Sequence, residues 1–162
     1  MPDQNLLIFH SSGLDCAFPL EAVREIVPMA TLSTPPGLPS GLAGFLDLRG
    51  TGVPIVRLDR LFDLSDQQPG LHTPMIILRG VLAPIGILVA AVHAIVAVPP
   101  PGLIELPGDR TFKGCATAVL EIAGETVHVL SAAELVGANE DRLLADYGVV
   151  MQARLLHMEE TA

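Results

Sequence analysis

Short apolar runs, separated by proline and glycine, repeat along most of the chain. The first two runs are Leu6–Phe9 and Cys16–Leu20, and the polar segment Ser11–Asp15 forms a turn between them. Apolar runs of this length, bounded by turn-forming residues, predict β-strands. The next segment, Glu21–Val27, has apolar residues at positions 23, 26 and 27, which fits either one helical turn or a third strand.

A long loop and a hairpin follow. Thr34–Gly44 holds three prolines and three glycines in eleven residues, which blocks both a helix and a central strand. We predict a strand over Phe45–Arg49, a turn over Gly50–Gly52 and a returning strand over Val53–Leu58. Glycine suits this turn because it adopts positive φ angles at little cost. A short helix over Leu58–Leu64 is expected to end the first lobe.

The second half of the chain repeats the strand pattern. Further strands are predicted over Met75–Leu78, Ile85–Val98, Thr117–Ile122 and Glu125–Leu130. The Ile85–Val98 strand is long and is expected to bend, and the last two strands form a hairpin around Ala123 and Gly124. A second long loop covers Pro99–Gly114, and a short helix is expected over Ser131–Val136. Many short strands with two such loops predict an all-β fold of barrel-like or sandwich architecture.

The tail from Asp141 to Glu160 has a different pattern. Its apolar residues are spaced by 3, 4, 4 and 3 positions, and they are Leu144, Tyr147, Met151, Leu155 and Met158. This spacing predicts an amphipathic helix, which Gly148 weakens. Such a helix packs on its own protein more often than it binds a partner, and both roles remain open.

Composition narrows the choice of partners. The length of 162 residues fits one domain, or two small lobes that share one core. Half of the residues are apolar and 17% are charged, so the chain can build a substantial core. The net charge of −9, from 18 acidic and nine basic residues, argues against a nucleic-acid partner and against attachment to an anionic membrane surface.

One uncharged segment, Gly80–Pro101, is long enough to suggest a transmembrane span. Its interior run Ile85–Val98 has only 14 residues, is rich in valine and isoleucine, and is followed by three prolines. A pair of buried strands therefore fits better than a span, and no direct membrane insertion is expected. The first residues lack the basic segment of a signal peptide, so we expect a cytoplasmic protein.

The sequence offers no recognisable metal or cofactor site. None of the five histidines belongs to an HxxxH or HExxH pair; they are His10, His72, His93, His128 and His157. We therefore predict no metal and no cofactor, and expect His93 and His128 to be structural. Cys16 and Cys115 stand in no CxxC pattern and are expected to be small buried residues in a reducing compartment.

Catalytic motifs are equally weak. Ser40 does not stand in a G-x-S-x-G nucleophile elbow. Asp59, Asp63 and Asp66 form a small acidic cluster, for which a solvated face is the simplest explanation. The more informative residue is Arg49, beside a glycine turn in a chain with few basic residues, because its planar fork suits the recognition of carboxylates and carbonyls. The alternative is a salt bridge from Arg49 to Asp47 or Glu25 within the chain.

Taken in order, these segments resemble the CheW domain family. Gly44–Leu58 is similar to the family hallmark G-x-x-N-L-R-G-x-x-x-P-(V/I)-(V/I)-x-L. Val23–Val27 resembles its V-x-E-I-(I/V) element, and Gly86–Val98 resembles its G-x-L-V-D-x-V-x-x-V-x-x-V strand. The resemblance spans about residues 5 to 137. Asp47 replaces the motif asparagine, and Ala90 replaces the usual aspartate.

The resemblance implies two interleaved small five-stranded SH3-like barrels that share a hydrophobic core. The CheW-like domain would cover residues 1–137 with a lobe junction near 62–74, and a C-terminal helical extension would cover 138–162. CheW-type proteins are non-catalytic adaptors that bridge chemoreceptor signalling tips to the CheA kinase, so the chain is expected not to be an enzyme.

The partners that the resemblance implies are the regulatory domain of a CheA-like histidine kinase and the tip of a methyl-accepting chemoreceptor. The family's receptor-facing groove includes positions that match Val23, Glu25, Gly44 and Arg49, which we therefore predict as partner-binding residues. Two alternatives remain: a CheW-like scaffold in a non-motility system such as surface sensing or pili, and a small hydrolase or ligand-binding β-barrel with a loop as its lid.

Overall fold

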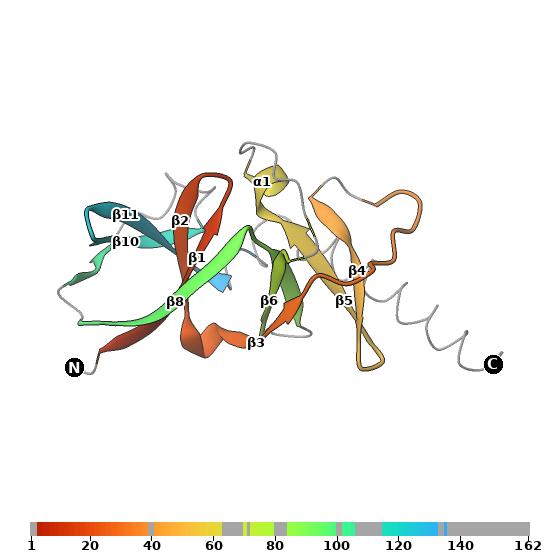
Figure 1. Ribbon diagram of the computed structural model, residues 1–162, viewed down its shortest axis with the longest axis horizontal. Coiled ribbons are helices and arrows are strands. Elements are labelled where there is room, and N and C mark those ends of the chain that lie inside the picture. Colours follow the sequence, from red (N-terminus) through yellow and green to blue (C-terminus); the bar gives the residue numbers. More distant parts are fainter. Residues whose placement is uncertain are drawn as a thin grey trace.

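The structure is a computed structural model that describes residues 3–38, 41–62, 70, 72–79, 84–99, 102–105, 115–132 and 135. Strands dominate this part of the chain and form two sheets that lie side by side along the long axis (Figure 1). The predicted helical extension over 138–162, with its apolar stripe, lies outside the described residues.

The first sheet has six strands in the order β8-β1-β2-β11-β10-β9. Their bounds are β1 Gln4–Ser11, β2 Leu14–Pro19, β8 Ala91–Val98, β9 Ile104–Glu105, β10 Ala116–Ile122 and β11 Glu125–Leu130. Neighbouring strands are antiparallel except for the parallel pair β2 and β11. The two-residue β9 adds a sixth strand at one edge to the five that were expected.

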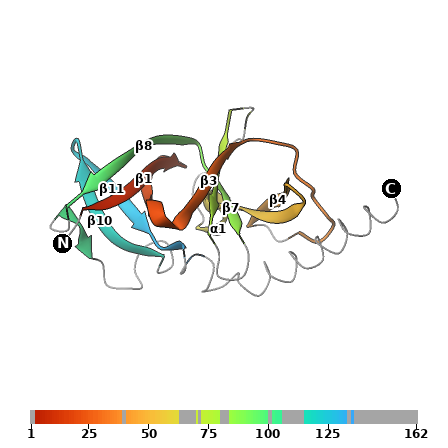
Figure 2. The ribbon, with the colours of Figure 1, turned by 90° about the horizontal axis from the view of Figure 1, so that it is seen from below.

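The second sheet has five strands in the order β3-β6-β7-β5-β4. Their bounds are β3 Val23–Pro28, β4 Leu42–Leu48, β5 Thr51–Arg57, β6 Pro74–Leu78 and β7 Ile85–Leu88. The pair β5 and β7 is parallel and the other pairs are antiparallel. Viewed from below, β1, β8, β10 and β11 gather at one end of the molecule, and β3, β4 and β7 lie beyond them (Figure 2).

The two sheets are interleaved in sequence, as predicted. The five-stranded sheet is one continuous segment, β3 to β7, inserted between β2 and β8 of the six-stranded sheet. The chain therefore passes between the sheets at the 3₁₀ turn η1 (Leu20–Ala22) and again between β7 and β8. The segment 62–74, where the lobe junction was expected, connects β5 and β6 within one sheet, because β6 pairs with β3 and β7.

Two sequence ambiguities are settled by these crossings. The segment Glu21–Val27 contains both predicted structures, since η1 ends at Ala22 and β3 begins at Val23. The apolar run Ile85–Val98 is two strands rather than one bent strand, because the chain leaves the second sheet after Leu88 and joins the first sheet at Ala91. The pair of strands considered as the alternative to a membrane span is therefore confirmed, although most of β8 is exposed or half-buried rather than buried.

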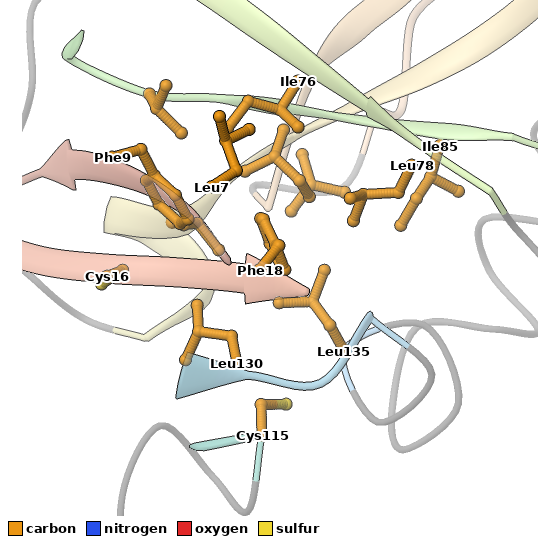
Figure 3. Packing of buried hydrophobic residues seen from close by; sticks show 14 of the residues in the cluster. Leu7, Phe9, Cys16, Phe18, Ile76, Leu78, Ile85, Cys115, Leu130 and Leu135 are labelled. Atoms are coloured by element: carbon orange, nitrogen blue, oxygen red, sulfur yellow. The ribbon is translucent and has the colours of Figure 1, made fainter. Parts of the chain in front are cut away.

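The largest hydrophobic cluster lies between the two sheets and ties them together. It includes Leu7, Phe9 and Phe18 from the first sheet, whose side chains face those of Ile76 and Leu78 from the second (Figure 3). The rings of Phe9 and Phe18 stack with their centroids 5.0 Å apart. Each sheet also has a smaller cluster of its own, built around residues such as Leu6 and Val127 in the first sheet and Ile55 and Met75 in the second.

Three hairpins use the same two-residue turn. The central residues Ser12-Gly13, Arg49-Gly50 and Ala123-Gly124 all have positive φ, between 52° and 88°. Two consecutive positive φ angles define a type I′ turn, whose twist matches that of the flanking strands. The Ala123-Gly124 turn was predicted correctly. In the β4–β5 hairpin the predicted turn over Gly50–Gly52 was too late, because the turn begins at Arg49 and both Thr51 and Gly52 pair inside the sheet.

Candidate partner-binding surface

Arg49 lies at the tip of the β4–β5 hairpin rather than at the end of a strand. Its φ is 52°, a left-handed conformation that non-glycine residues rarely adopt. The side chain is 64% exposed. The turn therefore presents the guanidinium to solvent, where it can contact another molecule.

The guanidinium of Arg49 forms a bidentate ion pair with Glu25 on β3. One terminal nitrogen donates to Glu25 Oε2 at 2.6 Å, and the other donates to Oε1 at 3.3 Å. The hydrogen bond from Arg49 is the main cause that lowers the pKa of the Glu25 carboxyl below its usual value, and the charges of Arg49 and Arg24 act in the same direction. The same bond raises the pKa of Arg49. The alternative of an intrachain salt bridge from Arg49 to Glu25 is thus confirmed.

This ion pair joins opposite edges of the five-stranded sheet. β3 is one edge strand and β4 is the other, and three strands separate them in the sheet. A side chain at the β4–β5 turn can reach β3 only because the sheet curls toward a closed barrel. The pair therefore brings two distant segments of the chain to one surface.

The outer side of β3 completes this surface. Arg24 and Ile26 are exposed, and Ile26 keeps 43% of its area open to solvent. The Nε of Arg24 lies 3.8 Å from Glu25 Oε2, so one carboxylate is shared by two arginines. We define the β3–hairpin surface as Arg24, Glu25, Ile26 and Arg49. It combines an exposed apolar side chain with charges of both signs.

The other two predicted partner-binding residues, Val23 and Gly44, are less exposed than Arg49. Val23 is half-buried and packs against the cluster between the sheets. Gly44 is buried at a φ of 150°, and a Cβ there would lie 2.7 Å from the backbone oxygen of Ser33. Glycine lets the backbone of Ser33 approach Phe45, with which it exchanges two hydrogen bonds of 2.8 Å. The structure thus joins Glu25 and Arg49 directly, whereas Val23 and Gly44 shape the strands around them.

The family assignment follows from a sequence comparison. A family model described as CheW-like domain matches residues 5–150, which is most of the chain and includes strands from both sheets. The chain belongs to the CheW-like domain family. The resemblance seen in the sequence motifs is thereby confirmed.

A solved structure shows the same fold as this CheW-like domain. The scaffolding protein TtCheW from Thermoanaerobacter tengcongensis superposes with a TM-score of 0.77, covering 86% of this chain and 95% of that chain. Sequence identity is 18%, so this likeness concerns the fold, and it confirms the expected pair of small β-barrels. No curated protein matches the chain in sequence.

The departure of Asp47 from the CheW motif has a structural explanation. Its Oδ1 accepts a hydrogen bond of 2.9 Å from the backbone N–H of Gly50. The side-chain oxygen of the usual asparagine can accept the same bond, since both residues place an oxygen at this position. Replacing the asparagine therefore preserves the turn that presents Arg49 and adds one negative charge beside it.

The sequence did not reveal a buried ion pair at the end of the hallmark block, between Arg57 and Asp59. Arg57 donates to both carboxylate oxygens of Asp59, at 3.1 Å from Nε and 2.6 Å from a terminal nitrogen. The two side chains are only 11% and 3% exposed. The expectation that Asp59 belongs to a solvated acidic face was therefore wrong, and Asp63 and Asp66 lie outside the described residues. Opposite charges two positions apart at a strand end were the available signal.

Two further features concern the ligand-binding or hydrolase alternative and the membrane-span alternative. A hollow of about 470 Å³ is lined by Asp3, Gln4, Asn5, Leu20 and Glu21, which include no histidine, serine or cysteine. Its carboxylates, from Asp3 and Glu21, therefore have no serine beside them among the lining residues. Within the described ranges, no helix has both the length and the apolar character needed to cross a bilayer.

Proposed function

We propose that this CheW-like protein is a non-catalytic adaptor that couples chemoreceptors to a CheA-type histidine kinase in the cytoplasm. Its partners would be the regulatory domain of the kinase and the signalling tip of a methyl-accepting receptor. The observation that carries the proposal is the family match over residues 5–150, which spans both sheets. The β3–hairpin surface supports it, because an exposed apolar residue on the same edge strand as charges of both signs suits a reversible protein interface.

Arg49 is the residue of this surface most suited to anchor a partner. Arginine is enriched among the residues that dominate binding energy, and this one is mostly exposed at a hairpin tip. Its ion pair with Glu25 holds the guanidinium in one orientation before binding, which lowers the entropy lost when a partner docks. In this arrangement Glu25 positions Arg49, and the neighbouring Ile26 supplies apolar contact.

The proposal is tested by calorimetry of the purified protein with the regulatory domain of a CheA-type kinase, and separately with a receptor-tip fragment. Both partners would come from the genome that encodes this chain. We expect dissociation constants on the order of micromolar, as is usual for reversible signalling contacts. Failure to bind any of the CheA-like regulatory domains encoded there would overturn the coupling function.

Substitution of Arg49 by asparagine tests the surface itself. Asparagine tolerates the positive φ of a type I′ turn, so Arg49→Asn removes the charge without straining the hairpin. We expect binding to weaken about tenfold or more, as for other interface arginines. Arg60→Asn is the matched control, because Arg60 is an exposed arginine on α1 (Leu58–Leu61), which follows the other end of β5. Equal affinity of both variants would remove Arg49 from the interface.

A charge swap separates a contact with the partner from support of the hairpin. The double variant Glu25→Arg with Arg49→Glu can re-form the ion pair in reverse. If the pair only holds the hairpin in place, the double variant recovers the affinity that Arg49→Glu loses. If Arg49 touches the partner, as we propose, affinity stays low because the sign of the surface is inverted.

A further inference from the structure

Three potential metal ligands from three different strands meet at one end of the six-stranded sheet. His10 on β1, Asp15 on β2 and His93 on β8 each offer one ligand atom, and these atoms all lie within 4.8 Å of one another. Their positions in the sequence give no motif. The β3–hairpin surface belongs to the other sheet and shares none of these residues.

The carboxylate of Asp15 is the centre of the group. Its Oδ1 lies 3.0 Å from His10 Nδ1 and 3.9 Å from His93 Nε2. The two imidazole rings face each other at a tilt, with centroids 6.0 Å apart. The side chains of His10, Asp15 and His93 are 37%, 27% and 51% exposed, so an ion from solvent can reach them.

Sheet register explains how these residues meet. His10 and Asp15 are directly opposite each other in the β1–β2 hairpin, so their side chains lie on the same face. On β8, Ala94 pairs with Ile8, which lies on the same face as His10. Alternation alone would therefore turn the side chain of His93, the adjacent residue, to the opposite face. A bulge intervenes there, since Ile8 pairs with Ala94 whereas the next residue, Phe9, pairs with Val92. His93 is the extra residue of this bulge, and bulges re-aim side chains.

Strand pairing also fixes the backbone positions of the three candidate ligands before any ion binds. Asp15 is held between two neighbouring strands, pairing with His10 on one side and with Val127 on the other. The backbone oxygen of His10 accepts a hydrogen bond of 2.9 Å from the N–H of Ala90, where β8 is about to begin. Ligands on paired strands keep their relative positions better than ligands on loops.

We propose that His10, Asp15 and His93 form a binding site for a divalent first-row transition-metal ion of the Zn²⁺ class. Two imidazoles and one carboxylate suit zinc, nickel, copper and cobalt, whereas Mg²⁺ and Ca²⁺ prefer sites made of oxygen ligands. Around a tetrahedral zinc, bonds of 2.0–2.2 Å place ligand atoms roughly 3.3–3.6 Å apart. The separations of 3.0 and 3.9 Å from Asp15 lie close to this range, and all three ligand atoms lie within 4.8 Å of one another, so side-chain rotations can close the site around an ion.

The simpler explanation is a hydrogen bond between His10 and Asp15 with His93 nearby by chance. It accounts for the 3.0 Å contact but not for the bulge that brings a second imidazole to the same carboxylate oxygen. With three protein ligands, a tetrahedral ion would keep one position open to water or to a donor from another molecule. Bound metal would join β1, β2 and β8 at their common end.

The test uses the full-length protein without an affinity tag, stripped of metal with a chelator. Calorimetry with ZnCl₂ measures affinity and stoichiometry, and CoCl₂ reports coordination through its visible absorption. We expect one ion per chain and a higher melting temperature in zinc, because the ion binds only the folded arrangement of the three strands. His93→Gln and Asp15→Asn should each weaken binding at least about tenfold, since even the loss of an outer partner of a ligand costs that much.

His72→Gln is the matched control, because His72 is an exposed histidine outside the group. It should leave the affinity unchanged. If a variant misfolds, wild-type NMR spectra still decide, since zinc should shift the imidazole signals of His10 and His93 and not those of His72. Zinc binding too weak to detect at millimolar metal overturns the proposal. So does binding that depends on His10 but not on His93, because the site would then lack its third ligand.

Discussion

Arg49 occupies a backbone conformation that few arginines adopt, and its side chain still reaches across the sheet to Glu25. The sequence suggested either a recognition role for Arg49 or a salt bridge within the chain to Asp47 or Glu25. It could not choose Glu25 over Asp47, since the choice depends on how the sheet curls. The structure gives Asp47 a different task, the hydrogen bond to Gly50.

The Glu25 carboxyl should report this contact by NMR. Arg49→Asn removes the hydrogen bond and the charge that lower the pKa of Glu25, so we expect that pKa to rise toward its ordinary value. In the wild type, the stabilisation from the pair is present above the ordinary glutamate pKa and is lost as the pH falls through the lowered value. A Glu25 pKa that is the same in both proteins would show that the pair does not form in solution.

Asp59 should matter for stability because its negative charge is buried against Arg57. Asp59→Ala leaves the guanidinium of Arg57 without this carboxylate in a nearly dry site, and we expect a loss of about 3 kcal/mol or more in the free energy of unfolding. Urea denaturation measures it. The double variant Arg57→Met with Asp59→Leu should recover much of the loss, since it removes both charges. A loss below about 1 kcal/mol for Asp59→Ala would mean that water solvates the pair.

Residue-scale prediction from sequence failed where burial or strand register decides the outcome. Asp59 was expected in solvent because the sequence does not show that its carboxylate is buried against Arg57 at the start of α1. The grouping of His10, Asp15 and His93 was not predicted, because each stands alone in the sequence and only strand pairing and one bulge bring them together. Gly44 was predicted as a partner-binding residue, and its buried contact with Ser33 adds a packing requirement that no motif states.

At the scale of strands and turns, most elements were predicted and their boundaries were less accurate. β1, β6, β10 and β11 overlap the apolar runs that predicted them, because alternation and turn residues are local signals. β4 begins at Leu42, inside the loop predicted over Thr34–Gly44, because pairing with β5 overrides the local preference of glycine. The run Ile85–Val98 was interpreted both as one bent strand and as a pair of buried strands. Two strands form, but the place of the break was not predicted because both strands are apolar, and most of β8 is exposed or half-buried.

Gly86 is the element-scale contact most open to test. Gly86 is on β7, which pairs with β5 on one side and β6 on the other. A Cβ at this position would clash with Cδ1 of Ile55 and lie 3.1 Å from Cδ1 of Ile77. Gly86→Ala should therefore cost about 1–3 kcal/mol of stability, as overpacked cores do. Adding Ile55→Val removes the clashing methyl, so the double variant should lose less than the sum of the two single losses. Strict additivity would show that the strands shift to accept the methyl.

At the scale of the whole molecule, the interleaved topology couples the two sheets. Chain order places β3 to β7 between two parts of the other sheet, and the largest cluster takes side chains from both. The family resemblance predicted this arrangement; local sequence patterns alone did not, because pairing between β1 and β8 spans about half of the chain. Opening of one sheet exposes the apolar face of the other, so we expect the two to unfold together.

Cys16 offers a direct test of this coupling. It lies in the first sheet within the shared cluster, and burial raises the pKa of its thiol to about 12, so it should react with thiol reagents only after unfolding. In a Cys115→Ala background, Cys16 is the one remaining thiol. Under native conditions, the rate at which Cys16 is labelled then depends on the free energy of the unfolding event that exposes its thiol, either opening of the first sheet alone or of both sheets.

The informative substitution lies in the other sheet. Gly86→Ala perturbs contacts with Ile55 and Ile77 and touches nothing in the first sheet among its nearest neighbours. If the sheets open together, labelling of Cys16 accelerates about tenfold for each 1.4 kcal/mol that Gly86→Ala removes from global stability. If the first sheet opened on its own, labelling would keep its wild-type rate despite the lower melting temperature. We expect the acceleration, because Phe9 and Phe18 beside Cys16 pack in the cluster that also contains Ile76, Leu78 and Ile87 of the second sheet.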